Sequence, residues 1–174
     1  MAGQVTAQDS DRQARRLYED ADLFGRTLPA GTRLIGIDVG TKTLGLALSD
    51  VTRIIASGLT TLKREKFAHD VERLSELIAT HQVGGLVVGL PQNLDGADGP
   101  RAQSTRAFAR NLAKRLPLPI LLWDERFSTA AAERVLIEAS TSRRRRAAVI
   151  DKVAATLILQ TALDRINRTA ERER

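Results

Sequence analysis

The chain lacks several residue types, and each absence narrows its chemistry. Its 174 residues include no cysteine, which excludes disulfides, thiolate metal ligands and a cysteine nucleophile. It has only two histidines, His69 and His81, so a bound metal would depend mainly on oxygen ligands. Aromatic residues make up 3% of the chain, which argues against single-strand binding by base stacking. No apolar run approaches the ~18 residues that a membrane-spanning helix needs, so we expect no membrane partner.

A positive charge balance is the first feature that is present. The formal net charge is +6 and the pI is about 10.4. Such a balance favours polyanionic partners, nucleic acid first, although general solubility would explain it too. Arginine contacts to phosphate suit this composition better than base stacking does. The first residues, Met1–Val5, lack the charged and apolar regions of a signal peptide, so we expect a cytoplasmic location.

The most informative stretch of the chain is Leu34–Lys42. An apolar run there ends in a single carboxylate, Asp38, which is followed by Gly40 and Thr41. Burying a charge within a β-rich run costs free energy unless another group compensates it. A carboxylate in this place usually meets a metal ion, a phosphate-bound metal or a backbone cap. Asp38 could therefore bind a metal, or it could simply cap the turn that follows it.

The hydrophobic pattern predicts five strands and four helices. The predicted strands span 34–39, 43–49, 54–61, 84–89 and 119–123. The predicted helices span 67–80, 101–115, about 128–138 and 147–166. The first three strands are closely spaced and predict an antiparallel meander, whereas the later strands are separated by helices and predict parallel pairing. The fold class is therefore α/β, with a ribonuclease H-like mixed five-stranded sheet and helices on both of its faces.

The composition divides the chain into three parts. Residues 1–31 are polar and mixed in charge, and we predict a partly flexible N-terminal appendage that includes a short docking helix near Tyr18 and Phe24. The break at Pro29 and Gly31 separates it from a nuclease-type domain at 32–168. Residues 169–174 form a polar tail.

Three acids in different parts of the chain predict one site. Asp38 lies late in the first strand, Glu125 lies just past the fifth strand, and Asp151 lies near the start of the last helix. Ligand sites in parallel sheets form at the carboxyl ends of strands, where these acids can meet. Their mutual repulsion would be relieved by a divalent cation, and oxygen-only ligation suits Mg²⁺ or Mn²⁺. A two-ion model in which Asp38 bridges the ions predicts phosphodiester hydrolysis.

Each acid also has a simpler explanation. Glu125 could pair with Arg126 at the surface, and Asp151 could favour the positive end of a helix dipole. The combination of three acids at matching topological positions favours the shared site over these separate explanations.

Four ordered motifs resemble the YqgF/RuvX family of Holliday junction resolvases and pre-16S rRNA nucleases. They are Gly36–Lys42, Val88–Gly96, Asp124–Thr129 and Asp151–Ala155, within a match over about 33–166. The resemblance implies a ribonuclease H-like fold, a cytoplasmic bacterial protein and a role in maturing the 5′ end of 16S rRNA. It also implies that the catalytic and metal-binding acids are Asp38, Glu125 and Asp151.

Further polar residues near these motifs are candidates for binding nucleic acid. Lys42 and Arg126 flank the acids and could contact the cleaved phosphate, or they could pair with Asp124 or Glu125. Asn93 could bind metal or substrate, or it could only shape its loop. A basic loop at 140–146 contains Arg143, Arg144, Arg145 and Arg146, which we predict to bind the phosphate backbone. A solvated loop without a ligand is the alternative.

Other functions compete with ribosomal RNA processing. A resolvase acting on four-way DNA would need a symmetric dimer, and no segment predicts a dimer interface, so we expect a monomer or a weak homodimer. A non-catalytic nucleic-acid-binding module is a second alternative.

The Asp-x-Gly-Thr-Lys motif also resembles the first phosphate loop of the actin and sugar-kinase group, but those proteins clamp a nucleotide between two such domains. We favour the precursor of 16S rRNA over a DNA junction as the nucleic-acid partner. The ribosomal small-subunit precursor is a further candidate partner.

Overall fold

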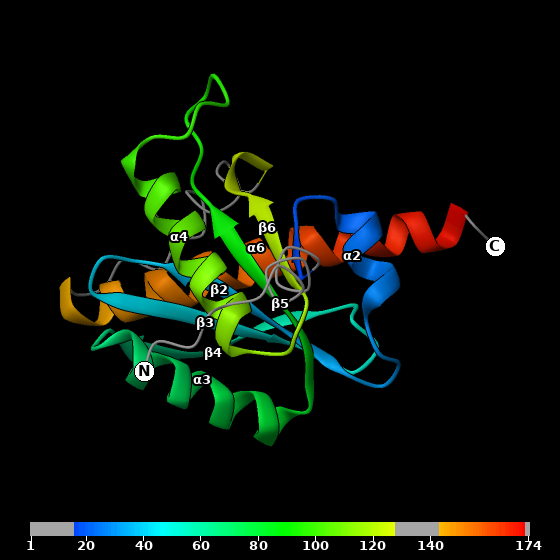
Figure 1. The fold of residues 1–174 in the computed structure, drawn as a ribbon, viewed down its shortest axis with the longest axis horizontal. Helices are drawn as coiled ribbons and strands as arrows, with labels where there is room; N and C mark the ends of the chain where they lie inside the picture. The colour runs from blue at the N-terminus through cyan, green and yellow to red at the C-terminus, as the bar shows by residue number, and fades with distance from the viewer. Residues whose placement is uncertain (1–15, 128–142, 173–174) are drawn as a thin grey trace, which may run out of the picture.

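The computed structural model describes residues 16–127 and 143–172. These residues build a mixed sheet in the order β1–β6–β5–β2–β3–β4 (Figure 1). Its strands are β1 (Leu17–Tyr18), β2 (Arg33–Val39), β3 (Thr43–Ser49), β4 (Ala56–Lys63), β5 (Val83–Leu90) and β6 (Ile120–Asp124). The helical elements are α2 (Ala21–Thr27), α3 (Phe67–His81), α4 (Pro100–Arg115), the 3₁₀ helix η1 (Glu125–Phe127) and α6 (Arg143–Arg172).

The strand directions confirm the predicted meander and crossovers. The pairs β2–β3 and β3–β4 are antiparallel, and β2–β5 and β5–β6 are parallel. The predicted number of five strands was wrong, because the described sheet has six. The additional strand, β1, pairs in parallel with β6 through Leu17 opposite Ile120. A strand of two residues is too short to produce a hydrophobic alternation that a sequence pattern could reveal.

Helices cover both faces of this sheet (Figure 1). Buried side chains on one face pack beneath α3 and α4, including Ile37 of β2 and Phe108 of α4. The other face packs against α6 and α2, with Leu34 of β2 beside Leu159 of α6 and Phe24 of α2. Alternate residues of a strand point to opposite faces, so Gly36 and Asp38 lie on the α6 face together with Leu34.

Glycines let α6 lie directly against the central strands. A Cβ atom on Gly36 would be 2.7 Å from the Cβ of Leu159. A Cβ on Gly45 would be 2.2 Å from the carbonyl oxygen of Asp151, a separation that real Cβ atoms do not show. The absence of side chains at Gly36 and Gly45 therefore sets how close α6 comes to β2 and β3.

The N-terminal segment joins the fold from residue 16 onward. Phe24 of α2 has no exposed surface, and Asp22 accepts hydrogen bonds from Arg165 (2.9 Å) and Thr169 (2.7 Å) of α6. A docking helix is therefore present at α2, but Tyr18, which was expected to belong to it, lies in β1. The division of the chain at residues 31 and 168 stays a prediction.

The basic segment before the last helix differs from its prediction. Residues 143–146 were expected in a loop, but they are helical, because α6 begins at Arg143. The helix also continues to Arg172, beyond the predicted end at 166. Alanine follows the four arginines and nothing in 143–150 breaks a helix, so the charge cluster itself suggested a loop that the backbone does not form. The helix predicted over about 128–138 and residues 140–142 lie outside the described residues. Within the described part of the chain, no helix is long and apolar enough to cross a membrane.

Candidate active site

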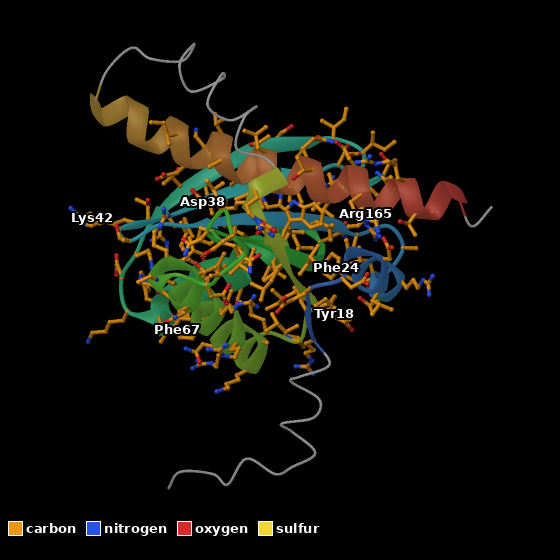
Figure 2. All side chains as sticks on the ribbon, turned by 90° about the horizontal axis from the view of Figure 1, so that it is seen from above. Tyr18, Phe24, Asp38, Lys42, Phe67 and Arg165 are labelled. Carbon is orange, nitrogen blue, oxygen red and sulfur yellow. The ribbon has the colours of Figure 1, made fainter. Side chains whose placement is uncertain are left out.

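Asp38 and Asp151 are close enough to interact electrostatically where α6 crosses the β2–β3 pair. Figure 2 shows Asp38 near α6. Asp38 is paired with Gly45 across the two strands, so no side chain separates it from the helix. The close approach of α6 to Gly45 places Asp151 over the same position. The hydroxyl of Thr43 donates a 2.6 Å hydrogen bond to Oδ2 of Asp151, which orients this carboxylate.

Glu125 approaches Asp38 from the β5–β6 side of the sheet, whereas Asp151 approaches it from α6. It begins η1 directly after β6, at the carboxyl end of the parallel strands. A Cβ atom on Gly89 of β5 would lie 2.6 Å from Oε1 of Glu125 and 2.4 Å from Cδ1 of Ile158. The bare backbone at Gly89 therefore leaves the space in which the Glu125 carboxylate lies. Because β5 is the neighbour of β2, this space adjoins Asp38.

The electrostatics couple the three acids through Asp38. Burial and, next in size, the charge of Asp151 together raise the pKa of Asp38 to about 6. Burial also raises the pKa of Glu125 to about 7, with Asp38 as the next cause. Arg101 opposes both shifts. Asp38 therefore takes part in two acidic pairs, one with Asp151 and one with Glu125.

These residues fit a divalent cation in donor chemistry. The donors are carboxylate oxygens, and the raised pKa values of Asp38 and Glu125 indicate negative charge that the protein alone does not neutralise. The described residues hold no group of three or more acids, histidines or cysteines already gathered around one point.

The raised pKa of Asp38 predicts an unusual dependence of stability on pH. In EDTA the folded protein binds more protons than the unfolded chain between the ordinary pKa near 4 and about 6, so stability falls as pH rises through this window. We expect Asp38→Asn to be more stable than the wild type at pH 8 by about 1–2 kcal/mol, and equally stable near pH 4. Thermal unfolding at both pH values measures this difference. The control is Glu76→Gln, an exposed acid on α3, and a variant of Asp38 that is less stable at both pH values would contradict the account.

The structure places the predicted nucleic-acid contacts in different settings. Lys42 is exposed at the β2–β3 turn and projects outward there (Figure 2). The Arg126 side chain donates hydrogen bonds of 3.0, 2.8 and 2.6 Å to the Asp124 carboxylate, which confirms the ion-pair alternative for this residue. Asn93 is exposed, and its carbonyl accepts a 2.8 Å hydrogen bond from the Gly96 N–H, so its backbone shapes the loop. Arg143–Arg146 begin α6, on the same helix as Asp151.

Sequence reasoning missed two residues of this site, Thr43 and Arg101. Thr43 looked like an ordinary strand residue, and Arg101 looked like the polar start of a helix. No local pattern marks either one, because their roles depend on contacts across 108 residues for Thr43 and on the placement of α4 for Arg101.

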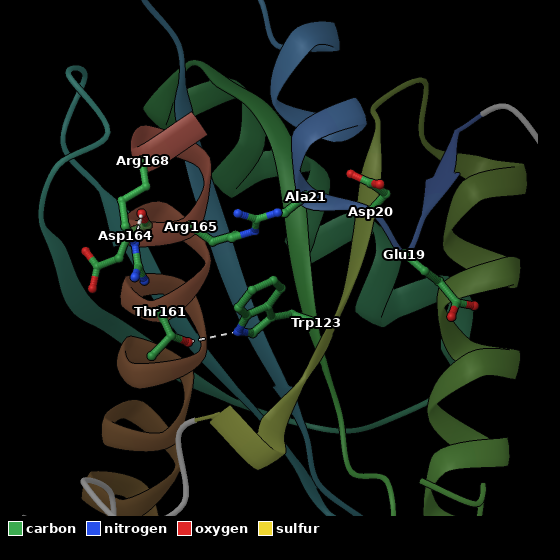
Figure 3. Close-up of a pocket in the computed structure, with 8 residues that line it drawn as sticks. All are labelled: Glu19, Asp20, Ala21, Trp123, Thr161, Asp164, Arg165 and Arg168. Atoms are coloured by element: carbon green, nitrogen blue, oxygen red, sulfur yellow. Dashed lines mark hydrogen bonds between the residues drawn. The ribbon is translucent and has the colours of Figure 1, made fainter. Parts of the chain in front are cut away.

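A hollow of about 580 Å³ lies elsewhere on the α6 face (Figure 3). The Nε1–H of Trp123 donates a 2.8 Å hydrogen bond to the Thr161 hydroxyl there. Thr161 is ten residues after Asp151, or about 15 Å along the helix. The three acids do not line this hollow, so the size of a cavity does not mark the candidate active site.

Known proteins match this chain over most of its length. The family model described as "RuvX: Holliday junction resolvase" matches residues 32–165. A protein of Roseobacter denitrificans named "Putative pre-16S rRNA nuclease" is 57% identical over 152 residues, covering 86% of this chain and 93% of the relative. A Cereibacter sphaeroides protein of the same name is 57% identical over 151 residues, covering 87% and 94%.

One solved structure shares the fold at low identity. Thermus thermophilus RuvC, solved in complex with a Holliday junction substrate, has a TM-score of 0.50 and 16% identity, covering 78% of this chain and 96% of that one. It supports the ribonuclease H-like fold. The matched family and the names of the curated relatives confirm the expected enzyme class, a hydrolase that cleaves phosphodiester bonds. With a family model that spans most of its domain and relatives that are more than half identical, this chain belongs to the RuvX family.

Proposed function

We propose that this protein is a divalent-metal-dependent nuclease that hydrolyses a phosphodiester bond in the precursor of 16S rRNA. The observation that supports the proposal is that α6 and η1 bring Asp151 and Glu125 close enough to Asp38 for its charge to interact with both. The names of the curated relatives support the ribosomal substrate. A cytoplasmic location, with the small-subunit precursor as the partner, follows from that substrate.

The chain's own residues have distinct roles in this proposal. Asp38, Glu125 and Asp151 would hold Mg²⁺ or Mn²⁺, which when bound activates water and stabilises charge on the phosphate. Thr43 fixes the orientation of Asp151, and Gly89 leaves room for Glu125. Carboxylates ligate a metal only when deprotonated, and the pKa values of about 6 and about 7 mean that protons compete at neutral pH. Lys42, Asn93, Arg126 and Arg143–Arg146 stay candidates for contacts to nucleic acid.

Resolution of four-way DNA is the second candidate function. The description of the matched family favours it. Cutting two strands of a junction in a coordinated way needs a symmetric dimer, so this function would be accompanied by dimerisation. Phosphate contacts by arginine do not discriminate the two substrates, because both present the same backbone charge.

A direct comparison of two labelled substrates tests the proposal. One mimics the 5′ precursor region of 16S rRNA and the other is a DNA four-way junction, each incubated with Mg²⁺ or Mn²⁺ and then with EDTA. We expect metal-dependent cleavage of the RNA, abolished by EDTA. Preferred cleavage of the junction by a dimer would select the second candidate. Binding without cleavage of either substrate would indicate a non-catalytic module and overturn the proposal.

A further inference from the structure

A second hollow, of about 180 Å³, lies next to the acids, between the β2–β3 turn and the first turns of α4. Val39 and Gly40, which directly follow Asp38, form part of its wall. The first turns of α4 contribute Arg101 and the hydroxyl residue Ser104 to the lining. Thr41 and Arg64, which hydrogen-bonds to Gly40, line the side of the β2–β3 turn. A space of this size suits a phosphate group rather than a whole nucleoside.

Arg101 is a cation that the fold does not use. It lies in the first turn of α4, is exposed, and forms no hydrogen bond or ion pair with the residues that the structure describes. Its charge nevertheless acts on two acids, because it lowers the pKa of both Asp38 and Glu125. The guanidinium is therefore close enough to the acids to act on a phosphate that binds there.

Arg64 is held rigidly on the other side of the hollow. Its Nη1 donates a 2.8 Å hydrogen bond to the carbonyl of Gly40, and its guanidinium lies 5.4 Å from the ring centre of Phe108. Its backbone N–H also donates to the carbonyl of Lys42 at 2.8 Å. An arginine has five N–H donors, so this arrangement fixes the group and leaves donors for a ligand. Pre-organisation of this kind lowers the entropic cost of binding.

We propose that this hollow is a phosphate-binding subsite in which Arg101 and Arg64, with the Thr41 hydroxyl, bind the backbone phosphate next to the one that is cleaved. The inference rests on the proposed nuclease function and deepens it. Paired guanidiniums suit phosphate recognition because each presents a planar fork of donors. The positive end of α4 adds to the same potential. The subsite would set which bond of the strand lies over Asp38, without reading its bases.

The alternative is that Arg101 only neutralises the acids. Binding of a labelled RNA strand in EDTA, measured over a range of salt concentrations, separates the two roles. We expect Arg101→Ala to bind about tenfold more weakly, and its slope of log affinity against log salt to be smaller by roughly 0.7–0.9. Arg64→Ala should behave similarly, and Arg101→Lys should keep most of the slope. The control is Arg110→Ala, an exposed arginine on the same helix that does not line the hollow.

The binding experiment distinguishes failure of the phosphate subsite from failure of the proposed nuclease function. Wild-type affinity and slope in Arg101→Ala would overturn the subsite, whether or not the wild type cleaves RNA. An equal loss in the Arg110→Ala control would also overturn it, because the effect would then be general charge. A wild type that cleaves neither substrate, while Arg101→Ala still loses slope, would refute the nuclease proposal and retain the phosphate subsite. Thermal unfolding of each variant checks that the fold is intact.

Discussion

Asp38→Asn should lower the rate of phosphodiester cleavage by roughly 10³-fold or more, the largest effect among the three acids. Loss of metal-supplied stabilisation is worth several kcal/mol, and each 1.36 kcal/mol is a factor of ten in rate. Asp38 ranks first because it belongs to both acidic pairs, whereas Glu125 and Asp151 each belong to one. Single-turnover cleavage by Asp38→Asn, Glu125→Gln and Asp151→Asn measures this ranking.

Metal titration adds a second readout to the same series. If Glu125 and Asp151 each serve one half of the site, raising the Mn²⁺ concentration should partly rescue their variants but not Asp38→Asn. The exposed Glu76→Gln is the matched control and should cleave as the wild type does. Equal activity of Asp38→Asn and wild type would remove Asp38 from the active site and with it the two-pair arrangement.

The sequence predicted much of the fold because its signals are local. The buried run at β2, the spacing of α3 and the glycine turns follow from hydrophobic period and turn chemistry within short windows. The two-residue strand β1 could not be found this way, because only its pairing with β6 makes it a strand. The four arginines at the start of α6 misled the prediction, since a repulsive charge cluster suggested a loop where the backbone is helical.

The candidate acids and their mutual repulsion were predicted from the sequence, but the contacts that position them were not. Asp38 stood out as one carboxylate in an apolar strand, and the topology of alternating strands and helices suggested where Glu125 and Asp151 would lie. The contacts that organise them, such as the hydrogen bond from Thr43 to Asp151, join residues far apart in the chain. The same is true of Gly45, which reads as a small strand residue and proves to be the point of closest approach of α6.

Gly45→Ala should destabilise the protein by roughly 3 kcal/mol, at the upper end of the range for overpacked sites. The new methyl group would lie 2.2 Å from the Asp151 carbonyl oxygen and 2.6 Å from its carbonyl carbon, and backbone atoms cannot turn away as a flexible side chain can. This steric clash is relieved only if α6 moves away from β3. For a chain of this size the midpoint of thermal unfolding should fall by about 6–12 °C.

The same displacement should impair cleavage well below the unfolding temperature, because it moves Asp151 away from Asp38. Gly58→Ala on β4 is the matched control: its new methyl group would meet Cβ of Lys152 at 3.4 Å, an ordinary contact on the same helix. We expect this control to change stability by less than about 1 kcal/mol and to cleave normally. If Gly45→Ala matched Gly58→Ala in both measurements, the position of α6 would not depend on the bare backbone at β3. The geometry that joins Asp151 to Asp38 would then need another cause.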